Sequence, residues 1–387
     1  MMIDLRPILL LLTFLTSLEA FAPLTRKIPR CSSLATTRRD MLLTTATGSL
    51  WVAKQGSTEP VADLPMIRLK LPRGGLGREY VAIRLKVDGQ GPYEFMVDSG
   101  LTTELITPHL QQSLRITSGG EKMSGIGAGG GKLQDLVELK QTTLCCGKGD
   151  QEIDIPNLHA LITDFPQEHI DPAHDPVEGM IGMELLSMFD VDFDFPNGRL
   201  RFWKPGTVAS EALAAGLVEV PAVVINETGL IGIRLAAPGA KQPILAFLDC
   251  GASFSAINWA AAPYLGLPPK DDPSYSKAPS VAAIGVDGRP LQLPTAKKEL
   301  TFLGEITRDA AGKPTGFASP PLQWTNWKPV QLAVGDLPAF ANLLGDGVTP
   351  YRGPGALLGL DVLSQRRVIL EAARDDTRRR RVFISPQ

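Results

Sequence analysis

Two short segments place an aspartate at the end of an apolar run, with a glycine two residues later. The first reads FMVDSG and ends its apolar run at Asp98; the second reads AFLDCGA and ends its run at Asp249. A buried carboxylate at a strand end is rare unless it is paired or used. Two such loops, facing one another across a pseudo-twofold axis, would put two carboxylates in contact. Two carboxylates in contact cannot both ionise without a large cost.

The two segments belong to an internal repeat, which predicts two homologous lobes. Residues 81–110 align with residues 231–261, with one extra residue in the second copy. Two further matched pairs follow in the same order: 125–131 with 284–288, and 181–187 with 358–364. Such self-similarity is the signature of a duplicated unit. We expect an N-terminal lobe over 65–205 and a C-terminal lobe over 217–387, joined near Pro205-Gly206.

Each lobe has the pattern of short strands bounded by Gly, Pro, Asn and Asp. The 38 Gly and 32 Pro agree with a mostly β protein rich in turns. The predicted strands include 80–86, 93–98, 190–195, 244–249 and 366–371, and one short helix recurs at 183–187 and 360–364. Residues 303–354, which hold Trp324 and Trp327, have no evident counterpart in the first lobe and are predicted to be an insertion.

The order of these motifs resembles that of pepsin-like and retropepsin-like aspartic proteases. In that family two hydrophobic residues precede Asp-(Ser/Thr)-Gly, a glycine-rich flap follows, and two hydrophobic residues precede a Gly before a short helix. Here the full order occurs twice and covers nearly all of residues 65–387. The resemblance implies an all-β, bilobal aspartic-protease-like fold, with two homologous retropepsin-like β lobes and a cleft between them.

The resemblance also implies a role for each residue of the motifs. Asp98 and Asp249 would share one proton and hold the attacking water, without a metal, a cofactor or a covalent intermediate. The other implied residues are Ser99, Gly100, Cys250 and Gly251 in the two catalytic loops, Gly125, Ile126, Gly127, Ile284 and Gly285 in two flaps, and Gly182 and Gly359 beneath the loops.

Two residues depart from the family pattern. Cys250 replaces the usual Ser or Thr, whose hydroxyl would join the two loops, and a thiol is a poor hydrogen-bond donor. Cys250 is interpreted either as inert packing or as a redox-sensitive thiol that gates the dyad. Leu101 stands where the family has Ala or Ser, and is expected to crowd the cleft.

The predicted function is an aspartic-type endopeptidase that cuts extended protein segments at mildly acidic pH. One alternative is a catalytically inactive peptide-binding module on the same fold, and another is a processing enzyme with a single substrate. Convergence of Asp98 and Asp249 favours the enzyme, whereas divergence, or Leu101 between them, favours the binding module. The expected partner is a protein or peptide substrate, and a monomer suffices because one chain supplies both lobes.

Charge and cysteine content bound the other function classes. With 39 basic and 41 acidic residues, the net charge of −2 gives no general attraction to nucleic acid or anionic lipid. Cys145 and Cys146 are adjacent and can bond to each other only with strain, so they imply no disulfide framework. The sequence has no CxxC pair, so it does not predict a cysteine-ligated metal site. His169 and His174 are interpreted as a polar loop rim rather than metal ligands. Arg378–Arg381 are predicted to be the solvated turn of a terminal hairpin, with an acidic partner as the alternative.

The N-terminal region has the pattern of targeting segments. An apolar run at 8–17 behind Arg6 predicts a signal peptide over 1–20, too short to span a bilayer comfortably. Residues 21–64 resemble a plastid transit segment followed by a twin-arginine signal at Arg38-Arg39, which predicts the thylakoid lumen. Alternatives are a secreted or endomembrane protein, or residues 41–53 as a membrane anchor or tail. We expect the mature chain to begin between residues 54 and 65, without a stable membrane span.

Overall fold

The computed structural model of the 387-residue chain describes residues 59–70, 79–127, 130–146, 151–165, 167, 174–225, 228–238, 240, 242–284, 290–318, 329–345, 349–372 and 379–386. The chain divides into two units, Met1–Gly56 and Ser57–Gln387, and all the described residues belong to the second. The predicted signal peptide and most of the transit segment therefore lie outside the described residues. Within these ranges, no helix is long and apolar enough to cross a bilayer.

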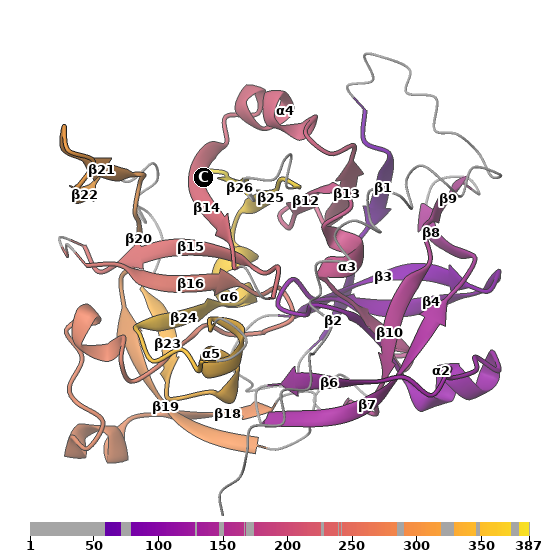
Figure 1. The fold of residues 1–387 in the computed structure, drawn as a ribbon, viewed down its shortest axis with the longest axis horizontal. Coiled ribbons are helices and arrows are strands. Elements are labelled where there is room, and N and C mark those ends of the chain that lie inside the picture. Colours follow the sequence, from indigo (N-terminus) through magenta and orange to yellow (C-terminus); the bar gives the residue numbers. More distant parts are fainter. Residues whose placement is uncertain are drawn as a thin grey trace, which may run out of the picture. The chain divides into compact units, whose positions relative to one another are not determined.

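The first lobe is built on a ten-stranded sheet, coloured indigo to magenta in Figure 1. Its strand order is β6-β7-β10-β5-β11-β4-β3-β8-β9, with β2 paired to β3. The elements of this lobe are β2 (Ile67–Leu69), β3 (Tyr80–Val87), β4 (Gln90–Val97), β5 (Glu104–Ile106), α2 (Pro108–Ser113), β6 (Lys122–Gly127), β7 (Gly130–Leu139), β8 (Thr142–Cys146), β9 (Gln151–Ile155), β10 (Leu158–Ile162), β11 (Gly179–Ile181) and α3 (Met183–Leu186).

A fourteen-stranded sheet joins the end of the first lobe to the second lobe. Its order is β1-β13-β12-β25-β26-β14-β15-β16-β24-β17-β23-β19-β18, with β20 paired to β15. The strands are β1 (Ala62–Pro65), β12 (Asp190–Asp194), β13 (Arg199–Trp203), β14 (Val218–Val224), β15 (Ile231–Ala236), β16 (Ile244–Leu248), β17 (Ala256–Ile257), β18 (Ser280–Ile284), β19 (Pro290–Lys298), β20 (Thr301–Phe302), β23 (Val330–Val334), β24 (Gly355–Leu358), β25 (Arg367–Leu370) and β26 (Arg379–Ile384).

Short helices and one small hairpin complete the described part of the chain. They are α4 (Val208–Ala214), η1 (Ala262–Leu265), η2 (Pro273–Lys277), the hairpin β21 (Ile306–Arg308) with β22 (Pro314–Phe317), α5 (Pro338–Leu343) and α6 (Leu360–Leu363). The recurring helix was predicted at α3 and α6, but α2, α4, α5 and the two 3-10 helices were not, because segments of four to seven residues are too short to show helical periodicity.

The two lobes repeat the same strand pairings around their aspartates. In the first lobe β4 runs parallel to β11, which pairs antiparallel with β5, which in turn runs parallel to β10. In the second lobe β16, β24, β17 and β23 pair in the same order and directions. The registers also match, since Val97 faces Ile181 and Leu248 faces Leu358. The expectation of an all-β, bilobal aspartic-protease-like fold is confirmed.

Two details of the predicted organisation need correction. Residues 303–354 are not wholly an insertion, because β23 is the counterpart of β10 and only its sequence has diverged. The first lobe also begins before residue 65, because β1 pairs with β13 and β2 pairs with β3. Together these two strands match β14, which pairs with both β26 and β15 in the second lobe.

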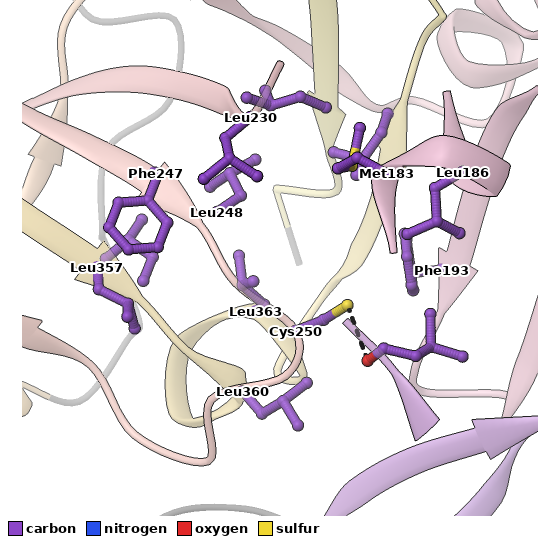
Figure 2. Close-up of a cluster of buried hydrophobic side chains, with 14 of the residues drawn as sticks. Met183, Leu186, Phe193, Leu230, Phe247, Leu248, Cys250, Leu357, Leu360 and Leu363 are labelled. Atoms are coloured by element: carbon purple, nitrogen blue, oxygen red, sulfur yellow. Dashed lines mark hydrogen bonds between the residues drawn. The ribbon is translucent and has the colours of Figure 1, made fainter. Parts of the chain in front are cut away.

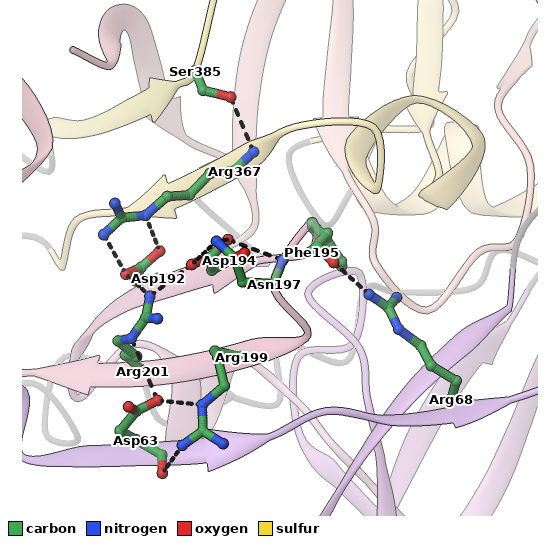
Figure 3. Close-up of polar contacts among 10 residues, drawn as sticks. All are labelled: Asp63, Arg68, Asp192, Asp194, Phe195, Asn197, Arg199, Arg201, Arg367 and Ser385. Atoms are coloured by element: carbon green, nitrogen blue, oxygen red, sulfur yellow. Dashed lines mark hydrogen bonds and ion pairs between the residues drawn. The ribbon is translucent and has the colours of Figure 1, made fainter. Parts of the chain in front are cut away.

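A network of buried charges lies where strands of the two lobes pair (Figure 3). Asp192 on β12 is fully buried, and both its oxygens accept hydrogen bonds from Arg367 on β25, at 2.9 and 2.7 Å. Arg201 on β13 contacts the same carboxylate at 3.1 Å and Asp194 at 3.0 Å. Because β12 and β25 belong to different lobes, these paired charges fix the lobes at this seam.

Arg379, Arg380 and Arg381 belong to β26 of this sheet rather than to a solvated turn, which corrects the prediction for these three residues; Arg378 lies outside the described residues. Arg380 on β26 is only 8% exposed, and burial lowers its pKa to about 10. The guanidinium of Arg381 donates to both oxygens of Glu371, at 2.6 and 2.5 Å. The sequence did not reveal this because the pairing of β26 with β14 on one edge and β25 on the other, which makes it an internal strand, joins segments far apart in the chain.

One hydrophobic cluster extends through both lobes. Met183, Leu186 and Phe193 from the first lobe belong to the same cluster as Leu248 and Leu360 from the second (Figure 2). A contiguous contact cluster of this kind defines a shared core rather than two separate ones. The loops that carry Asp98 and Asp249 therefore emerge from a single packed body.

We predict that Asp192→Asn lowers the free energy of unfolding by about 3 kcal/mol, because it leaves Arg367 and Arg201 without their buried countercharge. Chemical denaturation would measure this change. The matched control is Asp63→Asn, which removes a 42% exposed ion-pair partner of Arg199 and should cost less than about 1 kcal/mol. Equal costs for the two variants would contradict the assignment of the seam to Asp192.

Candidate active site

The two aspartates occupy equivalent positions and meet between the lobes. The N–H of Asp98 donates to the carbonyl of Ile181 at 2.9 Å, and that of Asp249 donates to the carbonyl of Leu358 at 3.0 Å. Their carboxyl groups are hydrogen-bonded to one another. Both residues are half-buried, so the pair is enclosed by the protein yet still reached by solvent. Two acids 151 residues apart in the sequence thus form one group of oxygens.

Gly100 and Gly251 place backbone amides and empty space where the pair requires them. The N–H of Gly100 donates to Asp98 Oδ1 at 2.8 Å, and that of Gly251 donates to Asp249 Oδ1 at 2.9 Å. A Cβ on Gly100 would lie 2.5 Å from the Cγ of Asp249, and one on Gly251 would lie 2.1 Å from the Cγ of Asp98. Each glycine therefore packs directly against the carboxylate of the opposite lobe.

Ser99 and Cys250 join the two loops by a reciprocal set of hydrogen bonds. Ser99 Oγ donates to the carbonyl of Leu248 at 2.9 Å and accepts from the N–H of Cys250 at 3.0 Å. Cys250 Sγ donates to the carbonyl of Val97 at 3.4 Å and accepts from the N–H of Ser99 at 3.2 Å (Figure 2). The thiol thus makes the same two contacts as the hydroxyl opposite. The expectation that Cys250 fails to join the loops is wrong.

The surroundings of Cys250 also bear on its interpretation as a redox switch. The residue is 2% exposed, and burial together with the charge of Asp98 raises the pKa of its thiol to about 12. Because the thiolate is the reactive form, a thiol in this environment is inert. The geometry therefore favours a structural role for Cys250.

Gly182 and Gly359 lie directly beneath the two catalytic loops, at the positions that the sequence indicates. The residue after each glycine donates its N–H to a loop carbonyl: Met183 to Leu101 at 2.7 Å, and Leu360 to Ala252 at 2.8 Å. A Cβ on Gly182 would lie 2.8 Å from the carbonyl oxygen of Leu101, and one on Gly359 would lie 2.6 Å from that of Phe254. Only glycine permits this close approach of the chain to each loop.

Leu101 does not lie between the two carboxyl groups, which are hydrogen-bonded to one another. It is half-buried and packs against a small cluster of the first lobe that includes Met96, Leu105 and Met180. A second cluster beside the main core thus accommodates a side chain larger than the Ala or Ser of the family pattern.

The electrostatics of the pair are those of two acids that share one proton. Burial raises the pKa of Asp98, although hydrogen bonds from Gly100 and Asp249 oppose the rise. Burial and then the charge of Asp98 raise the pKa of Asp249 well above its ordinary value. The pair therefore holds one proton between its two carboxyl groups, and the larger rise of the pKa at Asp249 favours Asp249 as the acid of the pair.

Two residues near the site were not identified from the sequence. The hydroxyl of Tyr80 shares a hydrogen bond with Ser253, and burial followed by the charges of Asp249 and Asp98 raises its pKa. Glu104 is buried and is the first residue of β5, the strand that follows the first catalytic loop. No motif marks Tyr80, but the repeat aligns Glu104 with Ser255, a substitution that could have drawn attention to it.

Both predicted flaps are β-hairpins. In the first lobe β6 pairs with β7, so that Gly125, Ile126 and Gly127 face Lys132, Gly131 and Gly130. In the second lobe β18 pairs with β19, and Ile284 ends β18 with 46% exposure. Gly285 lies outside the described residues.

The remaining candidate ligands form no metal site in the part of the chain that the structure describes. No group of three or more His, Cys, Asp or Glu side chains gathers there in a metal-binding arrangement. His174 lies with Nε2 2.6 Å from Glu94 Oε2, and His169 is outside the described residues. Cys145 lies on β8 as a free thiol.

Comparison with known proteins agrees with this geometry. A family model described as "Aspartyl protease" matches residues 83–185, a segment that runs from β3 through Asp98 and Gly182 into α3. This match confirms the resemblance to aspartic proteases that the sequence motifs indicate. No curated protein sequence matches the chain significantly.

Two solved structures are similar to most of the chain at low scores. Basic 7S globulin from soybean has a TM-score of 0.42 and 10% identity, covering 84% of this chain and 95% of its own. Conglutin gamma, a basic 7S globulin from lupine seeds, has a TM-score of 0.37 and 12% identity, with the same coverages of 84% and 95%. At TM-scores below 0.5, neither structure bears on the activity of this chain.

The reciprocal bonds between the loops make a prediction for Cys250. Cys250→Ser keeps a donor and an acceptor at the same position and should leave stability unchanged within about 1 kcal/mol. Cys250→Ala leaves the buried N–H of Ser99 and the carbonyl of Val97 without these partners, and should cost about 1–3 kcal/mol. Urea denaturation distinguishes the variants, and indistinguishable Ser and Ala variants would show that the thiol only fills space.

The crossed glycine contacts make a second prediction. Gly251→Ala places a methyl group against the carboxylate of Asp98 and should reduce any activity of the dyad by about 100-fold or more, because the acids are pushed apart. Gly119→Ala is the control, since a Cβ there meets no atom within 4 Å. Unchanged activity in Gly251→Ala, measured beside that control, would rule out the observed dyad geometry as the active one.

Proposed function

We propose that the chain is an aspartic-type endopeptidase, which hydrolyses peptide bonds with a water activated between Asp98 and Asp249. The observation that carries the proposal is the hydrogen-bonded contact of the two carboxyl groups, one from each lobe. The amides of Gly100 and Gly251 and the Ser99–Cys250 bonds support the arrangement. A scaffold that only binds peptides would not require two buried acids to be held in contact at an energetic cost.

The proposed reaction uses the unequal protonation of the two acids. Ionised Asp98 takes a proton from the water while the water oxygen attacks the peptide carbonyl carbon. At the same time Asp249 donates its proton to the carbonyl oxygen. The tetrahedral intermediate then collapses. Asp98 gives its proton to the leaving nitrogen, the C–N bond breaks, and Asp249 regains a proton from a hydroxyl of the intermediate. Each turnover restores one ionised and one protonated acid.

This assignment gives the direction of the pH dependence. Since the pKa of Asp249 is raised, the pair keeps its proton at mildly acidic pH and loses it as the pH rises. Full protonation at still lower pH removes the base. Activity therefore falls on both sides of a mildly acidic range.

The proposed substrate is an extended segment of a protein or peptide, reached by the flap hairpins β6–β7 and β18–β19. A monomer is sufficient, because one chain supplies both acids. We also propose delivery to the thylakoid lumen of a plastid. The support for this localisation is the N-terminal sequence pattern alone, and an acidified lumen would suit the dyad.

The proposal predicts that wild-type protein cleaves an unfolded protein substrate at pH 4–6, whereas Asp98→Asn and Asp249→Asn are each slower by about 1000-fold or more. Each Asn keeps the size of the side chain but removes one half of the proton relay. Mass spectrometry of the cleavage products would measure the rates. Equal cleavage by all three proteins would end the proposal, and binding without cleavage by correctly folded wild type would favour a peptide-binding module.

A further inference from the structure

Beneath each catalytic loop, polar side chains join the strand after the loop to the short helix under it. In the second lobe Ser255, just before β17, donates through Oγ to Asp361 Oδ1 at 2.7 Å. The same Oγ accepts from the N–H of Gly359 at 3.0 Å. This contact satisfies both side chains and joins β17 to α6.

In the first lobe two glutamates occupy the equivalent positions. Glu104 precedes Leu105, which faces Met180, just as Ser255 precedes Ala256, which faces Leu357. Glu184 follows Gly182 and Met183 on α3, as Asp361 follows Gly359 and Leu360 on α6. The strand and the helix thus each carry an acid at these positions in this lobe, where the other lobe has a hydroxyl and an acid; Glu104 bonds to the backbone of α3, and the Glu184 side chain contacts His159.

Glu104 is held in a position that does not suit a charged carboxylate. Glu104 is fully buried, and its Oε1 accepts a hydrogen bond from the N–H of Leu185 at 2.9 Å. Its Oε2 is a buried atom without a hydrogen-bond partner. Burial, and then the charge of Glu184, raise the pKa of Glu104 to about 8, although the backbone N–H groups of Leu185, Glu104 and Gly182 oppose the rise.

No cation among the described elements packed against Glu104 neutralises it. Glu184 on α3 repels it, and β11 contributes no titratable group. On β10 the only such group is His159, whose N–H and Nδ1 lie 3.3 and 3.0 Å from Glu184 Oε1 and whose cross-strand neighbour is Glu138. Asp98, at the start of the loop, is a further acid.

We propose that Glu104 and Glu184 form a proton-operated clamp, which positions the Asp98 loop while Glu104 is protonated and loosens when it ionises. The positioning is indirect. Glu104 contacts the backbone of α3, Met183 at the start of α3 donates to the carbonyl of Leu101, and Ile181 accepts from the N–H of Asp98. Ionised Glu104 would be a buried, unpaired charge near the acid Glu184 on α3, and α3 would move away from β5.

The clamp gives a signed dependence of stability on pH. A carboxyl whose pKa is raised on folding stabilises the protein fully below its unfolded value of 4.5, and this contribution is lost as the pH rises through about 8. When Glu104 loses its proton, the Asp98 loop becomes less ordered and the protein becomes less stable. The inference that the clamp controls activity rests on the proposed endopeptidase function, whereas its effect on stability does not.

Glu104→Gln tests the clamp, because the amide is neutral at every pH and nearly identical in shape. Thermal unfolding of full-length protein between pH 5 and 9 should show the wild-type midpoint falling by at least about 5 °C more than that of Glu104→Gln. Glu104→Ser, which copies the second lobe, should also remove this pH dependence, and serves if the Gln variant does not fold. The control is Glu178→Gln, a buried acid of the same lobe bonded to Thr107, which should retain the wild-type dependence.

Peptidase assays supply the second measurement. At pH 8 to 9 the residual kcat of Glu104→Gln should exceed that of wild type by about tenfold with little change in KM, whereas the two should be equal at pH 5, a pattern that a merely structural role would not produce. Parallel midpoint curves for wild type and both Glu104 variants would overturn the clamp. If wild type cleaves nothing yet the midpoint curves diverge as expected, the clamp stands and the proposed function falls.

Discussion

The contact between the two carboxyl groups is the constraint on which the rest of the structure depends. Asp98 and Asp249 belong to different lobes, and burial makes their joint ionisation costly, so the pair is stable only when it holds a proton. Every feature around them serves to keep this contact. Gly100 and Gly251 leave space for the opposite acid, and the amide of each donates to the aspartate of its own loop.

The scaffold positions these loops through bonds that cross from one lobe to the other. The Ser99 and Cys250 side chains exchange hydrogen bonds with the opposite loop, and the Asp192–Arg367 pair joins β12 to β25 further along the seam. Because one hydrophobic cluster fills both lobes, neither half can turn independently without exposing apolar surface. The rigid seam between the lobes keeps the two acids in contact, although each would be better solvated apart from the other.

Much of the fold and the dyad could be predicted because the sequence of the first lobe is repeated in the second. The Asp-x-Gly loops and the glycines before α3 and α6 recur in the same order in both lobes, so the repeat supplied the pairing that a single copy could not. The contacts of Cys250 and Leu101 could not be predicted. Cys250 bonds to the carbonyl of Val97, and Leu101 packs against a small cluster from strands that are distant in the sequence. Likewise β23 was overlooked because only its pairing, not its sequence, is repeated.

The most direct test of the account is a titration of the two carboxyl groups by carbon-detected NMR of protein labelled at aspartate. We predict that Asp249 titrates well above the ordinary range in the wild type, and that its pKa falls in Asp98→Asn because the neighbouring charge is gone. If both carboxyls titrate independently near ordinary values, and Asp98→Asn leaves Asp249 unchanged, the two acids do not share a proton and the account is contradicted.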